Sequence, residues 1–172
     1  MTMLKKNNLV QTLEHNHEEA FQKTDQFYDV LVNLRYEGKA SFGKNMKEAE
    51  DVLKFFHGEH TRHMKLEDDV LFPFIKAHVP KLEPVIHLLH AEHEDFKRNL
   101  QSFECEINEL VKEKDESDKV RILEKIREIG TYMIYLLRSH NQSESNSIYH
   151  VIDHELHEDE IRELQDQIAR YR

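Results

Sequence analysis

The stretch that decides the fold is His63–Ile75, with the sequence HMKLEDDVLFPFI. His63 and Glu67 stand four residues apart in an otherwise apolar helical pattern, so their side chains share one face of a helix. The arrangement returns 77 residues later in His140–Ile152, HNQSESNSIYHVI, whose first and fifth residues repeat the pair. Recurrence in register sets this pattern apart from an isolated surface pair.

Two further histidines extend the pattern into an internal repeat. His17 and His93 each interrupt an apolar stripe of helical spacing, and they are 76 residues apart. His17 precedes His63 by 46 residues, and His93 precedes His140 by 47. Each half of the chain is therefore predicted to be a helix pair that carries the same polar insertions.

The spacing of apolar residues predicts four long helices and a short one. The long helices are expected over about 8–36, 44–72, 84–110 and from about 118 to beyond 144. Gly38 and Gly43 separate the first two, and Pro73 and Pro80 are expected to end the second. The short helix, at about 157–171, has an apolar stripe that needs cover from the bundle or from a partner, which keeps a homo-oligomer open.

Composition supports an all-α fold. Of the 172 residues, 34% are charged and 38% are apolar, and only 4 Gly and 3 Pro are present. This balance is typical of long, surface-charged helices and disfavours turn-rich β architecture. A chain of this length fits one domain. We expect residues 1–172 to form a single up-down four-helix bundle, with the repeat at about 8–152 and a short C-terminal helix at about 157–171.

Charge and hydropathy limit the partners and the compartment. A formal charge of -10 at neutral pH repels phosphate backbones and anionic lipid surfaces, so we expect neither nucleic acid nor membranes as partners. The start of the chain has no apolar core of signal-peptide length, which together with a single cysteine favours the cytoplasm. That cysteine, Cys105, lies between Phe103 and Ile107 and is predicted to be a buried small hydrophobe.

Six side chains have the pattern of metal ligands. They are His17, His63, Glu67, His93, His140 and Glu144. Each interrupts an apolar stripe, where an unpaired carboxylate would cost several kcal/mol or bind a proton. Bundles hold cofactors in their core with residues from facing helices. We therefore predict a two-metal centre in which Glu67 and Glu144 bridge the ions and the four histidines are terminal ligands.

The donor set indicates the metal. Each ion would have two imidazole nitrogens and two carboxylate oxygens, and even with a bridging oxide or hydroxide it would keep an open position for a diatomic molecule or peroxide. Such donors without thiolate suit iron or manganese, zinc is also acceptable, and redox chemistry on a small molecule favours two iron ions. The competing interpretation is a solvated His–Glu helix pair, worth a few tenths of a kcal/mol. Repetition in both halves favours the metal.

Other residues near the predicted centre have weaker patterns. Glu14 and His90 are equivalent in the repeat and are expected on the Glu67 side, either as hydrogen-bond partners of ligands or, preferably, as part of a wet bundle end. Four tyrosines are within reach of the centre but are interpreted as packing residues: Tyr28, Tyr132, Tyr135 and Tyr149. A histidine trio is interpreted as surface and only secondarily as a metal site: His150, His154 and His157.

The ordered pattern of His17, His63-x-x-x-Glu67, His93 and His140-x-x-x-Glu144 resembles the hemerythrin-like HHE cation-binding proteins over about residues 8–152. The resemblance implies an up-down four-helix bundle that encloses a non-haem di-iron centre. The chain differs from the oxygen-carrying hemerythrins, whose metal site has five histidines and includes a His-x-x-x-His on the third helix. Here His90 and His93 are three residues apart. Four histidines with two glutamates is similar to the iron–sulfur cluster repair branch, associated with nitric oxide and oxidative stress.

Two functions follow from this centre. The first is a non-haem di-iron protein that binds or reduces a small oxidant (O2, NO or peroxide) as a reversible carrier or sensor. The second is a di-iron oxidoreductase or an iron donor in the repair of iron–sulfur centres under nitrosative or oxidative stress. The third hypothesis is a different class of protein, a helical interaction protein that binds no metal. The sequence does not separate the first two, because both need the same open site.

Overall fold

A computed structural model describes residues 8–171, which are helical almost throughout. The first long helix is α1 (Asn8–Tyr36), and the third and fourth are α5 (Glu83–Lys112) and α6 (Glu116–Glu144). The second is a continuous helical segment made of α2 (Phe42–Phe55), the π-helical turn η2 (Phe56–His60), α3 (Thr61–Leu66), the π-helical turn η3 (Glu67–Leu71) and α4 (Phe72–His78). A further π-helical turn, η5 (Ser145–Tyr149), α7 (His150–His154) and α8 (Glu158–Arg170) complete the described chain.

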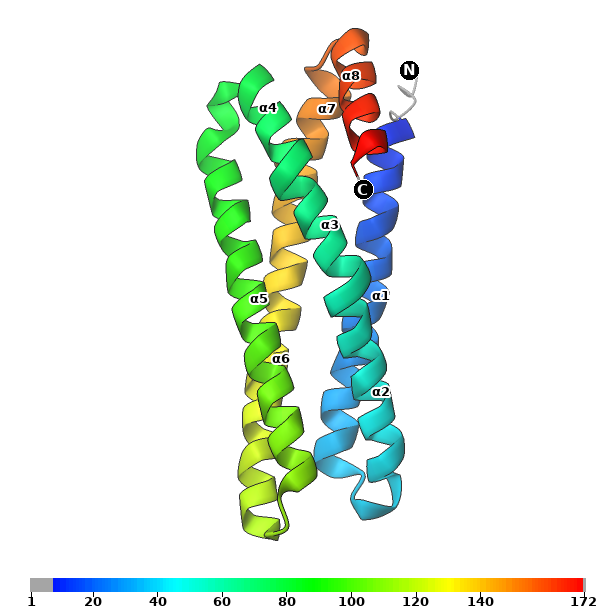
Figure 1. The fold of residues 1–172 in the computed structure, drawn as a ribbon, viewed down its shortest axis with the longest axis vertical. Helices are drawn as coiled ribbons and strands as arrows, with labels where there is room; N and C mark the ends of the chain where they lie inside the picture. Colours follow the sequence, from blue (N-terminus) through cyan, green and yellow to red (C-terminus); the bar gives the residue numbers. More distant parts are fainter. Residues whose placement is uncertain (1–7, 172) are drawn as a thin grey trace.

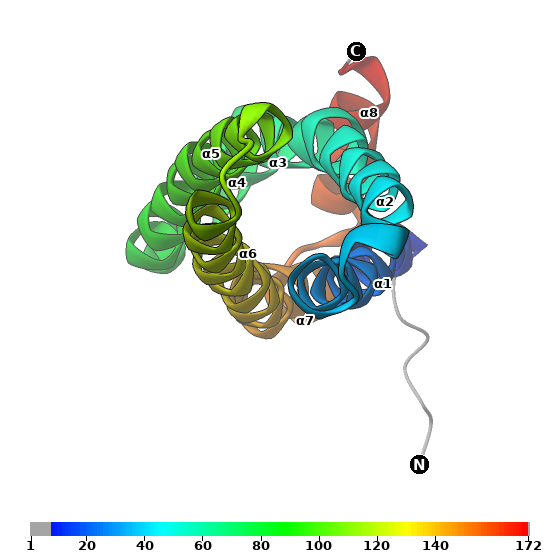
Figure 2. The same ribbon diagram turned by 90° about the horizontal axis from the view of Figure 1, so that it is seen from below.

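The four long helical segments run up and down and form a bundle (Figure 1). Seen along the bundle, they surround a common axis, with α1 beside α6 and α5 beside α6 (Figure 2). Residues 8–171 contain no strand. The all-α, up-down four-helix bundle with an additional short C-terminal helix is therefore confirmed.

Two apolar clusters fill the bundle, one toward each end. The larger cluster includes Phe27, Phe56 and Phe103, and its aromatic rings pack edge to face at centroid distances of 4.9 and 5.6 Å. The smaller cluster joins α4, α7 and α8 with the start of α1. A layer of buried polar side chains separates the two clusters along the bundle. Because apolar packing lies on both sides of this layer, its side chains are held away from water.

The second long segment does not end at Pro73, as the sequence predicted, but continues as a helix to His78. The π-helical turn η3 ends two residues before the proline, and the amide of Phe72 donates to the carbonyl of Glu67, five residues back. Pro73 then occupies the first turn of α4, where a missing amide hydrogen costs little. The wider turn thus accommodates a residue that normally ends a helix.

Cys105 is exposed, so its predicted burial was wrong. Its neighbours Phe103 and Ile107 are buried in the larger apolar cluster. Residues four apart share a helix face, whereas a residue two positions from both lies on the opposite side. Cys105 therefore faces solvent, on the side of the helix away from Phe103 and Ile107.

The C-terminal helix α8 covers one end of the bundle, near the start of α1 (Figure 1). Leu164 on its apolar stripe is fully buried in the smaller cluster, and Ile168 packs against that cluster. Tyr171, just after the helix, donates a 2.6 Å hydrogen bond to the Asp69 carboxylate on η3. The stripe thus finds its cover within the chain. Among residues 8–171, no helix combines the length and apolar character that crossing a membrane requires.

Candidate metal centre

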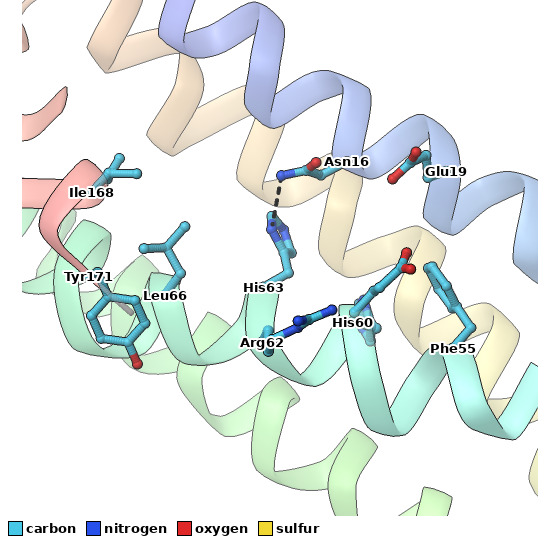
Figure 3. Close-up of a pocket in the computed structure, with 10 residues that line it drawn as sticks. Asn16, Glu19, Phe55, His60, Arg62, His63, Leu66, Ile168 and Tyr171 are labelled. Carbon is cyan, nitrogen blue, oxygen red and sulfur yellow. Dashed lines mark hydrogen bonds between the residues drawn. The ribbon is translucent and has the colours of Figure 1, made fainter.

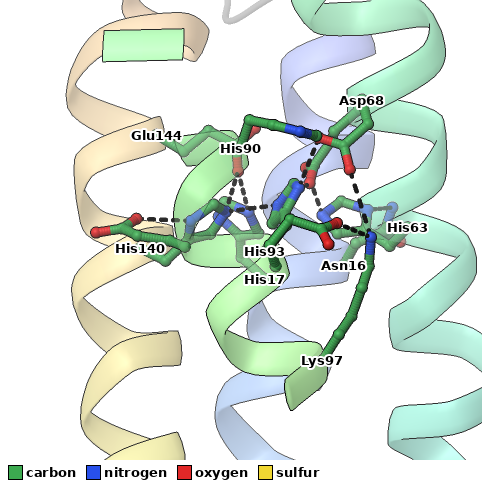
Figure 4. Close-up of polar contacts among 12 residues, drawn as sticks. Asn16, His17, His63, Asp68, His90, His93, Lys97, His140 and Glu144 are labelled. Carbon is green, nitrogen blue, oxygen red and sulfur yellow. Dashed lines mark hydrogen bonds and ion pairs between the residues drawn. The ribbon is translucent and has the colours of Figure 1, made fainter. Parts of the chain in front are cut away.

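The structure brings the six predicted ligands together in the polar layer of the bundle (Figure 4). Each helical segment contributes at least one of them. They are His17 on α1, His63 on α3, Glu67 at the start of η3, His93 on α5, and His140 and Glu144 on α6. The two glutamates are fully buried, and the histidine side chains are between 2% and 10% exposed.

One group of candidate donors consists of two histidines with both glutamates. His17 Nε2 lies 3.0 Å from Glu144 Oε2, within hydrogen-bond distance. His63 Nε2 lies 2.6 Å from Glu67 Oε1. One donor atom from each of these four residues falls within 4.8 Å of the others, close enough for one metal ion. We call this set the His17/His63 half-site.

A second group lies on the other side of Glu67. His93 Nε2 is 3.1 Å from His140 Nε2 and 3.2 Å from Glu67 Oε2. His140 Nε2 is 3.7 Å from Glu144 Oε2. Donor atoms of Glu67, His93 and His140 again lie within 4.8 Å of one another. This set, the His93/His140 half-site, shares Glu67 with the first, as a bridging carboxylate would.

The chemistry of the layer fits metal ions better than it fits a set of internal hydrogen bonds. Oε1 of Glu144 is buried and has no hydrogen-bond partner among residues 8–171. Both oxygens of Glu67 and Nε2 of His63 are buried too, and within the described residues they meet only one another and His93, in close ion pairs without hydrogen-bond geometry. Buried polar atoms in native structures are almost always satisfied, and exceptions call for an explanation such as an ion. Four imidazoles and two carboxylates are hard-to-borderline donors suited to iron, manganese or zinc.

Burial and mutual proximity perturb the two carboxylates in opposite directions. Burial alone would raise the pKa of Glu67, but the close approach and positive charge of His63 and His93 hold it well below its ordinary value. Burial and the nearby Glu67 charge raise the pKa of Glu144. One carboxylate of the pair is therefore firmly ionised, and the second resists ionisation until positive charge is supplied. A bound metal ion would supply such charge.

His93 is the most strongly supported imidazole. Burial lowers its pKa, but the hydrogen bond to Asp68 and the adjacent Glu67 carboxylate outweigh burial and raise it to about 9. Its Nδ1 donates to Asp68 Oδ1 at 2.9 Å, which leaves Nε2 directed at the centre. The ring also stacks on Phe72, with centroids 5.6 Å apart. A histidine whose far nitrogen is anchored in this way is oriented as a ligand.

Three predicted ligands lie next to π-helical turns. Glu67 begins η3, and Glu144 is the last residue of α6 before η5. Single π-helical turns inside α-helices occur frequently at functional sites, because the extra residue re-aims neighbouring side chains. His63 is one turn before Glu67, in the short α3 between two such turns. The second and fourth segments thus carry the same backbone irregularity beside their glutamates.

His60 is not among the predicted ligands, yet it is only 4% exposed. Its ring packs edge to face against Phe56 and Phe96, and its Nε2 has no hydrogen-bond partner among residues 8–171. Burial lowers its pKa well below the ordinary value, so the ring is neutral. The signal was its position three residues before His63, on the same helix face. It was not predicted as a ligand because, unlike His63 and His140, it has no glutamate four residues further on.

The residues behind the ligands were also missed. Asp68 and Glu92 accept hydrogen bonds from the Nδ1 atoms of His93 and His140, and Asn16 and Ser145 stand behind the other two histidines. Each is adjacent in sequence to a predicted ligand, which is the signal that could have identified them. His90, one of the two residues weighed for this role, donates to Asp68 at 2.9 Å although its side chain is 57% exposed.

The remaining candidates divide clearly. Tyr149 is buried and its hydroxyl lies 2.9 Å from His17 Nε2, whereas the other three tyrosines are exposed: Tyr28, Tyr132 and Tyr135. Burial and the two buried glutamates raise the pKa of Tyr149 well above its ordinary value, and Glu14 adds to this effect.

In the histidine trio, His150 and His154 stack on each other, and His157 caps the start of α8. Among residues 8–171, the trio is not one of the groups that could hold a metal.

A helical bundle whose core holds a His/Glu layer suited to cations defines the class of protein. The comparison with known families is more specific: residues 8–152 match the hemerythrin HHE cation binding domain. The chain therefore belongs to the hemerythrin HHE cation binding domain family. No curated protein matches the chain.

Proposed function

We propose that this protein holds two iron ions between its helix pairs and uses them to bind or reduce a small oxidant, O2, NO or peroxide. The observation that supports the proposal is the pair of overlapping donor groups that share Glu67. His17 and His63 would hold one ion, and His93 and His140 the other. Glu67 and Glu144 would bridge them from opposite sides.

The protein side chains prepare this chemistry. When bound, the irons supply electrons and open coordination positions for a small ligand. Apolar clusters on both sides exclude bulk water from the layer, which strengthens every electrostatic interaction within it. The hydroxyl of Tyr149, held neutral by its raised pKa, is the one phenol that reaches the donor atoms among the described residues. It is placed to donate a hydrogen bond to a ligand that arrives there.

Reversible binding, as in a carrier or sensor, is our first candidate. A cavity of about 490 Å³ between α1 and α3 is lined by His63, which gives a diatomic molecule a route to the centre (Figure 3). The same route would serve for the loss of a metal ion. It therefore supports the second candidate, an oxidoreductase or iron donor in the repair of iron–sulfur centres.

The deciding experiment combines metal analysis with optical titration of anaerobically purified protein. We expect about two irons per chain, an absorption spectrum that changes on exposure to air, and a stable adduct with NO or peroxide in the carrier case. Consumption of the oxidant with an added reductant, or loss of iron to an apo cluster protein, would identify the second candidate. Less than about one metal ion per two chains, with no gain in thermal stability on adding Fe(II), would overturn both.

A matched pair of variants ties the result to the predicted ligands. His140→Ala removes a donor from the centre, whereas His154→Ala removes an exposed histidine of α7 on the same polypeptide segment. We expect the first variant to lose iron and the adduct spectrum and the second to keep both. Equal iron content in the two variants would show that the histidine-rich layer is not where the metal binds.

A further inference from the structure

The ligands of the two half-sites repeat, but the groups that support them do not. In the His93/His140 half-site, both Nδ1 atoms donate to carboxylates: His93 to Asp68 and His140 to Glu92, each at 2.9 Å. In the His17/His63 half-site the partners are neutral. His63 Nδ1 lies 3.5 Å from the amide of Asn16, and His17 Nδ1 lies 3.4 Å from the hydroxyl of Ser145.

These partners occupy equivalent places in the repeat. Asn16 and Glu92 each precede the first histidine of their half, and Asp68 and Ser145 each follow the glutamate. The backbone therefore offers the same supporting positions on both sides, and only the side chains differ. Asp68 is 11% exposed and Glu92 17% exposed, so solvent screens their charges only in part.

A carboxylate behind a histidine makes that histidine a stronger metal ligand. It fixes the tautomer, orients the ring and raises the basicity of the coordinating nitrogen, and removing such a partner typically costs about 10- to 100-fold in metal affinity. A neutral amide or hydroxyl orients the ring without adding negative charge, whichever way the Asn16 amide is turned. Ions held by His93 and His140 thus gain support that ions held by His17 and His63 lack.

A second difference lies on the inner side of the half-sites. Tyr149 corresponds in the repeat to Phe72, and each ring stacks on the first histidine of a half, Tyr149 on His17 and Phe72 on His93. Only the tyrosine has a hydroxyl, and this hydroxyl hydrogen-bonds with His17 Nε2, the nitrogen that faces the centre. A metal ion must replace that contact to bind His17, whereas Phe72 offers His93 no such competitor.

Access is unequal as well. The cavity of about 490 Å³ reaches the centre beside His63 and Asn16, with α8 at its edge (Figure 3). A smaller hollow of about 220 Å³ lies on the other side of the bundle; its lining includes Asp68 and His90 and none of the six predicted ligands. The half-site with neutral support is thus also the one that adjoins open space.

We propose that the two metal positions are unequal: the His93/His140 half-site binds its ion more tightly and fills first, and the His17/His63 half-site is the weaker, exchangeable position facing the cavity. This inference rests on the proposed metal centre and concerns divalent transition metals as the ligand class. The two half-sites would then have different roles. The His93/His140 half-site would retain its ion, and the ion of the His17/His63 half-site would be exchanged or would bind incoming ligands.

The test is a titration of the full-length, metal-stripped chain with Co(II) and, anaerobically, Fe(II), in competition with a chelating dye. We expect two binding steps whose dissociation constants differ by about 10-fold or more. His17→Ala should abolish the weak step and keep the tight one, and His93→Ala should abolish the tight one. Far-ultraviolet circular dichroism of each metal-free variant checks that it is folded.

Variants that exchange the supporting groups test the cause. Asp68→Asn combined with Glu92→Gln removes both carboxylate charges, and we expect the tight step to weaken about 10- to 100-fold toward the weak one. Asn16→Asp adds charge behind His63 and should tighten the weak step. Glu94→Gln, an exposed carboxylate near Lys97 and not behind a ligand, is the matched control and should change neither step.

The outcomes separate this inference from the proposed function. Two ions bound with one common affinity in the wild type, or a tight step that survives His93→Ala and disappears in His17→Ala, would overturn the inequality while leaving the metal centre intact. A chain that binds no Co(II) or Fe(II) would overturn both. Unchanged affinities in the Asp68→Asn/Glu92→Gln variant would show that the carboxylates do not cause the difference.

Discussion

The two helix pairs of this bundle differ less in what they present to the centre than in what stands behind it. Both halves supply two histidines and one glutamate, and both have a π-helical turn beside the glutamate. Behind the histidines of the second pair, His93 and His140, stand Asp68 and Glu92, whereas Asn16 and Ser145 stand behind those of the first pair. A repeat can thus keep its ligand geometry while its supporting charges diverge, because the supporting positions do not determine the fold.

The largest expected effect comes from substituting a glutamate that both half-sites are proposed to share. In the proposed centre Glu67 and Glu144 would each bridge both metal positions, so we expect Glu67→Ala or Glu144→Ala to lower metal content and to remove most metal-dependent stabilisation. At a free metal concentration of about 1,000 times Kd that stabilisation is about 4.1 kcal/mol, or roughly 8–16 °C in Tm for a chain of this size. Metal analysis and thermal unfolding with and without Fe(II) measure it. Full occupancy in both variants would show that neither carboxylate bridges.

The free energy of unfolding of the metal-free chain should depend on pH through His93, in the His93/His140 half-site. The folded pKa of His93 is about 9, above its ordinary value of 6.5, so its stabilising contribution is complete below about pH 6.5 and is lost as pH rises to about 9. The shift corresponds to at most about 3 kcal/mol. Urea unfolding between pH 6 and 9.5 should show this decline, and it should be much smaller in His93→Gln. An equal decline in that variant would contradict the assignment.

The connections within the two halves differ in their backbone requirements. Gly38, in the first helix pair, has φ 77° and ψ -168°, a region almost restricted to glycine, so Gly38→Ala should cost about 1–3 kcal/mol. In the second pair, Asp115 caps α6 by accepting hydrogen bonds from the amides of Ser117 and Asp118. Asp115→Ala should cost about 1 kcal/mol. Urea unfolding compares the two losses, and a larger loss at Asp115 would reverse the expected order.

The smallest expected effect concerns the aromatic residue that differs between the halves. Tyr149→Phe gives the His17/His63 half the same ring as its counterpart, and removing the hydrogen bond to His17 should destabilise the metal-free chain by about 1 kcal/mol. The exposed Tyr135→Phe serves as control and should stay within about 0.5 kcal/mol of the wild type. If Tyr149→Phe is as stable as its control, the hydroxyl contributes nothing to the folded state.

The sequence supported a large part of this description. Helical periodicity located the long helices because their apolar stripes are regular, and the repeat identified His17, His63, His93 and His140 because each breaks a stripe. Pro73 was misjudged because the π-helical turn before it has no simple signature in the sequence. Cys105 was misjudged because its flanking core residues were considered without the rotation of the helix.

The sequence by itself determined the all-α bundle, its internal repeat and the six residues that the structure gathers into one buried layer. These depend on periodicity, which the order of residues records directly. Only the tertiary structure decided what supports each histidine and that the cavity opens beside His63. It also decided that Nε2 of His60 is buried without a hydrogen-bond partner among residues 8–171. Such features arise where different helices meet, and contacts between distant segments depend on how the helices pack and rotate against one another, which periodicity along one helix does not specify.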